Sequence, residues 1–441
     1  MTQEQSVVQE EFLQLQPNLA AAKLGCFLIL PLKYDPESLC LSPLEGILHR
    51  TTLSTMDVNE NIKAMLNSTD SAAVGSCYTI SRDGLLKELF PGKPLSRGSF
   101  FTVSAENGPY TFDFRSAYLY LFHTQVAFLC LGLSFDRMET IRQICNPGYA
   151  ENRSEFSLHV ADGTVIPFSL DTQLRSFCSK MGLLKFFDGE SSILLEGFTY
   201  MLALVPERFQ TLSAIRQTTF HLHLMAPLDT FVEDDSEEDV RYVYAVKDQR
   251  AGSYRWGCCV SSQTISYAVA DAAMDFDAEL HIQACDGLPV VLLALYEKYT
   301  CLRFTELLTH TEKKQIKRLR TLKRLMLNFQ AYGTVTPANL SRWHNVKRIY
   351  ACLLEVNEIT SAIQDIDGKL RVLTEHQREV ESTRNEAVTN IITIFGVVSI
   401  LASMLSIIQI LSGGDSFTWI ITILTSILLA VITVITVFLK K

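Results

Sequence analysis

The stretch Ala387–Leu411, AVTNIITIFGVVSILASMLSIIQIL, holds 25 residues without a charge. Ser412–Ser416 follows, and Phe417–Leu439, FTWIITILTSILLAVITVITVFL, then adds 23 uncharged residues before Lys440–Lys441. A helix needs about 20 apolar residues to cross the hydrocarbon core of a bilayer, so each run is long enough. A buried helical hairpin in a soluble core is the alternative, but core helices rarely lack a charged face over such a length. The sequence therefore predicts two antiparallel membrane spans.

The charges around these runs predict their orientation. Arg371, Arg378 and Arg384 precede the first run and two lysines follow the second, whereas the connecting loop carries only Asp415. Basic residues stay on the cytoplasmic side, so we expect an inner-membrane protein with both termini in the cytoplasm and the loop outside. The first 16 residues are polar and do not form a signal peptide. The chain has 11 scattered cysteines and no CxxC pair, which indicates thiols in a reducing compartment rather than a zinc ribbon.

The first 286 residues alternate strand-like and helix-like patterns, which predicts a cytosolic α+β domain. Turn residues such as Asn107–Gly108 and Asp162–Gly163 separate runs of alternating hydrophobic residues, as in β-hairpins. Met1–Ala22 is expected to be a polar lead-in, and Pro31 to close a strand that begins at Cys26. The expected strands are Cys26–Leu30, Phe100–Val103, Tyr110–Phe114, Ala117–His123, Val126–Ser134, Glu155–Val160, Thr164–Phe168, Phe198–Val205, Phe220–Leu224, Tyr242–Val246, Tyr254–Ser261 and Thr264–Val269, with an amphipathic helix over Asp171–Phe187.

Two local patterns in this domain allow a functional interpretation. His221 and His223 lie two residues apart, so a strand would place both imidazoles on one face. A metal site needs a third ligand that the sequence does not identify, and a polar sheet face is the favoured interpretation. Glu233–Asp239 holds six carboxylates in seven residues. Such a run is usually a solvated loop, and the alternative is a cation-attracting or regulatory rim.

Residues 287–386 are expected to form a helical pair and a long stalk helix. A basic amphipathic helix with seven basic residues in Lys313–Arg324 follows an apolar helix over Leu288–Thr311. Its charges form a solvated face, or contact anionic lipid headgroups or an acidic stretch of a neighbouring subunit; the sequence does not rank these. Thr336–Pro337 is a good N-cap and first helical position after a break at Gly333. From Pro337 to Leu411 the pattern allows one continuous helix.

Two stripes run along this long helix. An apolar heptad stripe starts at Ile359 and Ile363, continues into the membrane run, and includes Gln377 and Arg384. It predicts either a wide helical bundle with a hydrated axis or packing on the chain's own helical pair. Small and hydroxyl-bearing residues form the second stripe, which serves close helix packing or lines a water-filled pore. The candidate pore-lining residues are Thr389, Asn390, Thr393, Ser399, Ser403 and Ser406, and the second run repeats the theme with Thr418, Thr422 and Thr425.

This layout resembles the CorA family of two-span magnesium transporters. The resemblance is carried by the order of elements over Gly287–Lys441 and by the stretch LLALYEKY at Leu292–Tyr299. It implies a homopentamer whose stalk helices surround a central pore, with Lys440 and Lys441 as a basic ring at the cytosolic face. The family signature at the outer end of the first span is Gly-Met-Asn. Here the outer loop has Gly413, Gly414 and Asp415 instead.

The functional expectation is a CorA-like channel or transporter for divalent cations with an altered selectivity loop, in which Asp415 attracts the ion. The alternative is a channel-forming or membrane-disrupting signalling or defence effector whose cytosolic domain senses a small molecule or a protein partner. We expect no cofactor, with magnesium or another divalent cation as the transported or regulatory ion. The sequence contains no GxSxG, HExxH, phosphate loop or GxGxxG after a strand, so we do not expect an enzyme. A net charge of −9 argues against a nucleic-acid partner.

Overall fold

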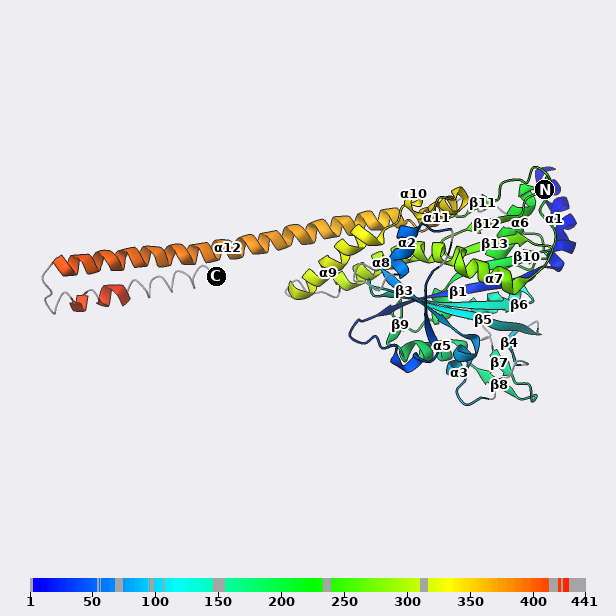
Figure 1. The fold of residues 1–441 in the computed structure, drawn as a ribbon, viewed down its shortest axis with the longest axis horizontal. Helices are drawn as coiled ribbons and strands as arrows, with labels where there is room; N and C mark the ends of the chain where they lie inside the picture. Colours follow the sequence, from blue (N-terminus) through cyan, green and yellow to red (C-terminus); the bar gives the residue numbers. More distant parts are fainter. Residues whose placement is uncertain are drawn as a thin grey trace. The chain divides into compact units, whose positions relative to one another are not determined.

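The computed structural model describes residues 3–53, 55, 57–67, 74–93, 95, 99–105, 108–145, 155–232, 239–309, 316–411, 419–421 and 423–427. The chain divides into two units, Met1–Ile366 and Asp367–Lys441. The first is a mixed α/β sheet domain together with the helices that cover it (Figure 1). The second contains most of the long helix α12. The helices between Gly287 and Val356 therefore belong to the same compact unit as the sheet.

One mixed sheet organises the first unit, and its order is β11-β12-β13-β10-β1-β6-β5-β4-β7-β8. Strand β3 joins β2 to β5, and β9 pairs with β1. All pairings are antiparallel except β10 with β13. The strands are β1 (Lys23–Tyr34), β2 (Leu48–Thr51), β3 (Gly75–Ile80), β4 (Phe100–Ala105), β5 (Gly108–Phe122), β6 (Val126–Phe135), β7 (Glu155–His159), β8 (Val165–Phe168), β9 (Leu183–Lys185), β10 (Phe198–Val205), β11 (Arg241–Tyr244), β12 (Trp256–Val260) and β13 (Thr264–Ala270).

The predicted hairpins are confirmed where the turn lies among the described residues. Gln125 has φ of +69° in the turn between β5 and β6, and Gly163 has φ of +87° between β7 and β8. Left-handed backbone of this kind suits a tight turn, and glycine adopts it without a steric cost. The register follows from these turns, since Phe122 pairs with Val126 and His159 pairs with Val165.

Helices cover both faces of the sheet, so its central strands are buried on both sides. The helices are α1 (Gln3–Ala20), α2 (Glu60–Asn67), α3 (Arg82–Leu89), α4 (Met138–Cys145), α5 (Leu170–Ser179), α6 (Leu212–His223), α7 (Phe276–Cys285), α8 (Gly287–Thr309), α9 (Ile316–Asn328), α10 (Pro337–Leu340), α11 (His344–Val356) and α12 (Ile359–Leu411), with 3-10 turns η1 (Ser42–Leu44) and η2 (Ile193–Glu196) and the π-helical turn η3 (Phe329–Gly333). Helix α8 lies on one face, where Tyr296 stacks on Phe122 with ring centroids 4.2 Å apart. Helices α3 to α6 lie on the other, over a core that includes Leu28 and Leu131.

The strand predicted to end before Pro31 continues to Tyr34 and is the centre of the sheet. Pro31 pairs with Phe128 of β6 on one side. On the other side it falls between two neighbours, because the pairing with β10 ends at Ile29 and the pairing with β9 starts at Leu32. A proline has no backbone N–H to donate to a neighbouring strand. At Pro31 no residue of β10 or β9 is paired on that side, so no such hydrogen bond is lost.

Three other local predictions were wrong. Phe220–Leu224 is not a strand, since it belongs to the end of helix α6 and its C-cap. Met1–Ala22 is not merely a lead-in, because α1 packs on α6 and buries Phe12 against the ring of His221. The helix predicted over Asp171–Phe187 ends at Ser179, and β9 follows it. In each case side-chain packing against a distant element decided the local structure, and a window of sequence does not contain that information.

The long helix is also shorter than the sequence allowed. Thr336 caps α10 as predicted, with its hydroxyl accepting from the N–H of Asn339. The chain then breaks at Ser341–Trp343 and again at Asn357–Glu358, where Glu358 has φ of +51°. From Ile359 to Leu411 it is one uninterrupted helix. Neither break contains a proline or a glycine, which is why the sequence pattern did not reveal them.

Candidate functional site

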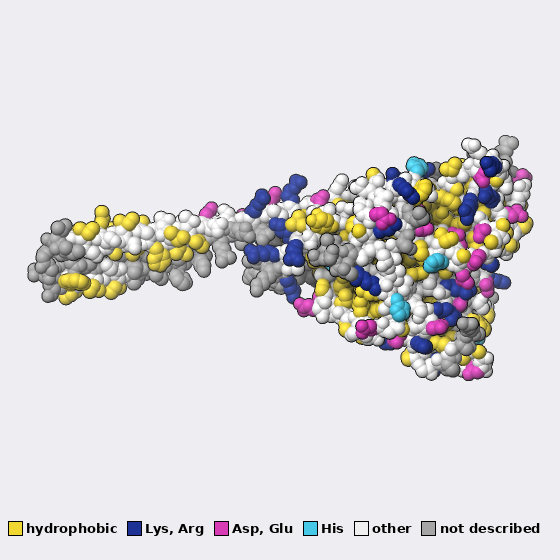
Figure 2. Space-filling view, in the orientation of Figure 1, with side chains coloured by type: hydrophobic (Ala, Val, Ile, Leu, Met, Phe, Trp, Pro, Cys, Tyr) yellow, Lys and Arg dark blue, Asp and Glu magenta, His cyan; other side chains and the backbone are white. Residues whose placement is uncertain are grey.

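One helix carries the segment that bears most directly on function. Within α12, Asn385–Ile408 is long and apolar enough to cross a membrane, with a mean hydropathy of 2.6 and none of it buried. Figure 2 shows exposed hydrophobic side chains along this part of α12. Ile392, Phe395 and Met404 are between 58% and 69% exposed. Exposed apolar surface on this scale marks a site of contact with a membrane or with other protein chains.

The predicted pore-lining hydroxyls lie on one face of this segment. A helix turns about 100° per residue, so the spacing of Thr389, Thr393, Ser399, Ser403 and Ser406 keeps them within an arc of less than half the circumference. All five are exposed. Gly396 lies in the same stripe and has open space around it. The face that these residues share is called the polar track below.

Three hydroxyls of the polar track donate hydrogen bonds to carbonyls of their own helix. Thr393 and Ser403 donate to the carbonyls of Thr389 and Ser399 at 2.8 Å, and Ser406 donates to the carbonyl of Ala402 at 3.0 Å. Bonds to the residue four positions earlier let a hydroxyl tolerate an apolar surrounding. Their oxygens keep further acceptor capacity, which is free to meet water or a cation.

The polar track continues toward the amino end of the helix as a hollow of about 620 Å³. It is lined by Arg378, Ser382, Asn385, Glu386, Thr389 and Asn390. Helical spacing places Arg378, Ser382 and Asn385 on the face that carries Thr389, and Asn390 lies at its margin. Polar residues therefore recur on this face from Arg378 to Ser406, over about 42 Å at about 1.5 Å per residue, with the exposed Ile392 and Ile400 between them.

The apolar heptad stripe occupies the opposite face of α12. Its first members Ile359 and Ile366 are buried within the sheet unit, at 0% and 1% exposure. Of the two packing modes that the sequence left open, packing within the chain therefore accounts for the start of this stripe. The side chains of Gln377 and Arg384 lie outside the described residues.

Several other predicted site residues also lie outside the described part of the chain. These are Gly413, Gly414 and Asp415 of the predicted outer loop, Lys440 and Lys441, and all of the acidic run except Asp239. In the second apolar run, 419–421 and 423–427 are helical, and the hydroxyl of Thr425 donates to the carbonyl of Ile421. Thr418 and Thr422 are not among the described residues.

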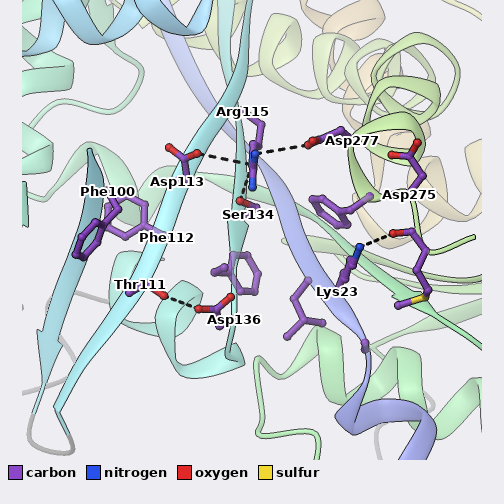
Figure 3. Close-up of a pocket in the computed structure, with 15 residues that line it drawn as sticks. Lys23, Phe100, Thr111, Phe112, Asp113, Arg115, Ser134, Asp136, Asp275 and Asp277 are labelled. Atoms are coloured by element: carbon purple, nitrogen blue, oxygen red, sulfur yellow. Dashed lines mark hydrogen bonds and ion pairs between the residues drawn. The ribbon is translucent and has the colours of Figure 1, made fainter. Parts of the chain in front are cut away.

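A second candidate site is a cavity of about 520 Å³ in the sheet unit, where β4, β5 and β6 meet the start of β1 and of α7 (Figure 3). Arg115 reaches into it from a bulge in β5, where the register shifts between Phe114 and Ser116. Its guanidinium donates to the hydroxyl of Ser134 at 2.8 Å and lies 3.8 Å from the carboxylates of Asp113 and Asp277. Bulges often redirect a side chain at a functional site. No pattern in the sequence indicated this cavity.

The charges around this cavity are mostly negative. Four carboxylates line it, with the amine of Lys23 and the guanidinium of Arg115 as the basic groups. Asp136 accepts from the hydroxyl of Thr111 at 2.6 Å, and Lys23 donates to the carbonyl of Met274. The remaining carboxylate, Asp275, caps α7 by accepting from the N–H of Ala278. The excess of carboxylates favours a ligand with a positively charged group.

A buried carboxyl on α8 holds the segment that leads into α12. Glu297 is 2% exposed and accepts hydrogen bonds from the N–H of Val335 at 2.7 Å and the hydroxyl of Tyr350 at 2.9 Å. Burial raises its pKa to about 7, although both hydrogen bonds act in the other direction. The next residue, Lys298, donates to the side-chain oxygen of Asn357 at 2.8 Å, beside the break before α12. Helix α8 therefore fixes the position of this joint.

The two histidines do not form the face that the sequence suggested. His221 is buried in α6, and its ring nitrogens lie within hydrogen-bonding distance of the carbonyls of Gln217 and Thr230. The ring is thus a satisfied core side chain. Within the described ranges, no group of three or more His, Cys, Asp or Glu side chains is placed to hold a metal ion.

Comparison with known proteins adds no assignment. No family model matches the chain, and no curated protein matches it.

Proposed function

We propose that the chain is a membrane-embedded, homo-oligomeric ion channel or transporter with a CorA-like arrangement of elements. The observation that carries this proposal is the polar track on an otherwise apolar and exposed helix. A helix that served only as an anchor would have no need for hydroxyl-bearing residues that recur on one face from Thr389 to Ser406.

The packing of α12 supports an oligomer. No residue of Asn385–Ile408 is buried within its own chain, so the polar track is available to other copies. One helix cannot enclose a water-filled path, whereas several copies around an axis can do so with their polar faces. The pentamer and the passage of divalent cations come from the resemblance. The two-pass topology is proposed from the two uncharged apolar runs, and the cytoplasmic position of both termini from the charges around them.

A second candidate function is a signalling effector in which the membrane segment opens or disrupts the bilayer after the sheet unit binds a ligand. The observation that favours it is the charged cavity around Arg115, which a simple transport stalk would not require. Both candidate functions use the membrane segment. They differ in whether the passage of ions through the membrane is selective and in whether it depends on a ligand bound to the sheet unit.

Flux through liposomes that contain the purified full-length chain tests both candidates. The same bulky residue is introduced on either face of α12, as Ser403→Phe on the polar track and Leu401→Phe on the heptad stripe. Mg²⁺ and a large trapped dye are followed together. The channel proposal predicts Mg²⁺ entry without dye release, abolished by Ser403→Phe and kept by Leu401→Phe.

The other results discriminate clearly. Release of the large dye favours the membrane-disrupting effector. Equal loss of Mg²⁺ entry in both variants contradicts a path along the polar track, and the absence of flux in every protein contradicts the channel.

A further inference from the structure

A long stretch of the sheet unit contains basic residues and no acidic ones. From Lys313 to Leu354 there are 42 residues with ten lysines and arginines and not one aspartate or glutamate, in a chain whose net charge is −9. A protein surface with random charge placement would carry several carboxylates over such a length. This concentration of one sign indicates a partner of the opposite sign.

Helix α9 presents these charges on a rigid face. Leu322, Met326 and the following Phe329 are buried, and the ring of Phe329 packs edge-on against Phe304 of α8 at 5.7 Å between centroids. On the other side, Arg320, Arg324 and Leu327 follow each other at spacings of four and three and are exposed. The apolar face of α9 is thus already used by α8, and the outward face combines guanidinium groups with an exposed leucine.

Exposed aromatic residues accompany these charges. Tyr332 in η3 is 61% exposed, and Trp343 before α11 is 45% exposed. The guanidinium of Arg342 lies 4.8 Å from the centroid of the Trp343 ring. Arginine, tyrosine and tryptophan with scattered leucine are the residue types that settle at the boundary between lipid headgroups and acyl chains.

We infer that the outward face of α9 (Arg320, Arg324 and Leu327) binds the headgroups of anionic phospholipids. The inference rests on the membrane insertion that the proposed function requires. Lipid headgroups are favoured over an acidic protein segment because the stretch has no carboxylate with which to set the register of a protein partner. The acidic run Glu233–Asp239 of a neighbouring copy is the competing partner.

Hydrogen exchange of the full-length chain in lipid nanodiscs tests this inference. Discs are made either from phosphatidylcholine alone or from an equimolar mixture with phosphatidylglycerol. We expect backbone amides of residues 316–328 to exchange several-fold more slowly in the anionic discs, and added salt to remove the difference. The double variant Arg320→Gln with Arg324→Gln should lose the difference. The control variant Lys93→Gln with Arg250→Gln removes two exposed basic residues that lie outside α9. It should keep the difference in exchange between the two kinds of disc.

The outcomes separate the inference from the proposed function. A chain that enters both kinds of disc and shows the same exchange of α9 in each contradicts lipid binding. Slow exchange of α9 in both discs, lost when the acidic run is neutralised, assigns the face to a neighbouring copy instead. A chain that enters neither disc contradicts the membrane insertion itself.

Discussion

Helices α8 and α12 are similar in composition and opposite in environment. In α8 every residue from Val290 to Leu295 is at most 2% exposed, because the helix lies on the sheet. With α7, across a bend of 41°, it even passes a length and hydropathy test for a membrane span. In α12 the segment Asn385–Ile408 meets the same criterion by itself, yet none of it is buried. Hydropathy alone therefore does not distinguish a core helix from a membrane helix.

The polar groups of the two helices show the difference more clearly. In the buried part of α8 the charged side chains of Glu297 and Lys298 are bonded to other elements, through Tyr350 and Asn357. In α12 the hydroxyls of Thr393 and Ser403 bond to their own helix. A helix in a protein core finds its partners in the surrounding protein, whereas a helix in lipid must satisfy its groups internally. The hydroxyls of Thr393 and Ser403 thus meet the condition that the proposed membrane position of α12 would set.

The largest expected effect comes from a charge placed in α8. Leu292 is 1% exposed, so Leu292→Asp buries a carboxylate without a partner. We expect the sheet unit to lose more than about 4 kcal/mol of stability, enough to unfold a typical domain. Circular dichroism of the purified chain during thermal unfolding measures this. Unchanged unfolding would contradict the buried position of α8.

The same substitution in α12 should act on a different property. Leu401→Asp lies in the exposed segment, so we expect thermal unfolding of the sheet unit to match that of the unaltered chain. Membrane insertion should weaken by about 3 kcal/mol, since a carboxylate at the centre of a span is unfavourable by that amount. Flotation with liposomes measures the loss. Full flotation of the variant, or a destabilised sheet unit, would contradict the claim that α8 is a core helix and α12 a membrane helix.

A pH dependence is expected from Glu297 in α8. Its pKa is raised from 4.5 to about 7, so the folded state holds this proton more tightly than the unfolded state. The stabilising contribution is complete below pH 4.5 and is lost as the pH rises to about 7. At about 1.4 kcal/mol per pKa unit this amounts to about 3 kcal/mol. In Glu297→Gln that part of the pH dependence should vanish, as measured by denaturant unfolding across this range. A variant with the original pH profile would exclude Glu297 as its source.

The smallest expected effect concerns the joint before α12. Glu358 has φ of +51°, which is unfavourable for a residue with a Cβ atom, so Glu358→Gly should stabilise the sheet unit by about 0.5–1 kcal/mol. Lys347→Gly inside α11 serves as the control and should destabilise it by about 1 kcal/mol. Thermal unfolding measures both. Destabilisation by Glu358→Gly would mean that the joint does not hold this conformation.

The sequence predicted the parts of the fold that depend on neighbouring residues. Turn residues and alternating hydrophobicity identified the β5–β6 and β7–β8 hairpins, and Thr336 was correctly predicted as a helix cap. Long-range packing decided the rest. Pro31 continues a central strand only because two different strands flank it, and residues 220–224 are helical because α6 packs on the sheet.

The candidate sites follow the same division. The polar track could be predicted because its residues recur at helical spacing within one continuous helix. The cavity around Arg115 could not, since Lys23, Arg115 and Asp277 are brought together by strands and a helix that are far apart in the sequence. Glu297 gave no signal either, because its raised pKa depends on burial by other elements.

Thiol accessibility along α12 in membranes tests the central claim most directly. Of the 11 cysteines only Cys40 is exposed, so Cys40→Ser provides a background of low reactivity. Single cysteines are then placed at Ser399 and Ser403 on the polar track, and at Val398 and Leu405 on the heptad stripe. With the full-length chain in liposomes and a charged, water-soluble methanethiosulfonate reagent, we expect rapid labelling at Ser399 and Ser403 and little at Val398 and Leu405. Equal labelling on both faces, or faster labelling at Val398 and Leu405, would contradict a water-filled path along the polar track.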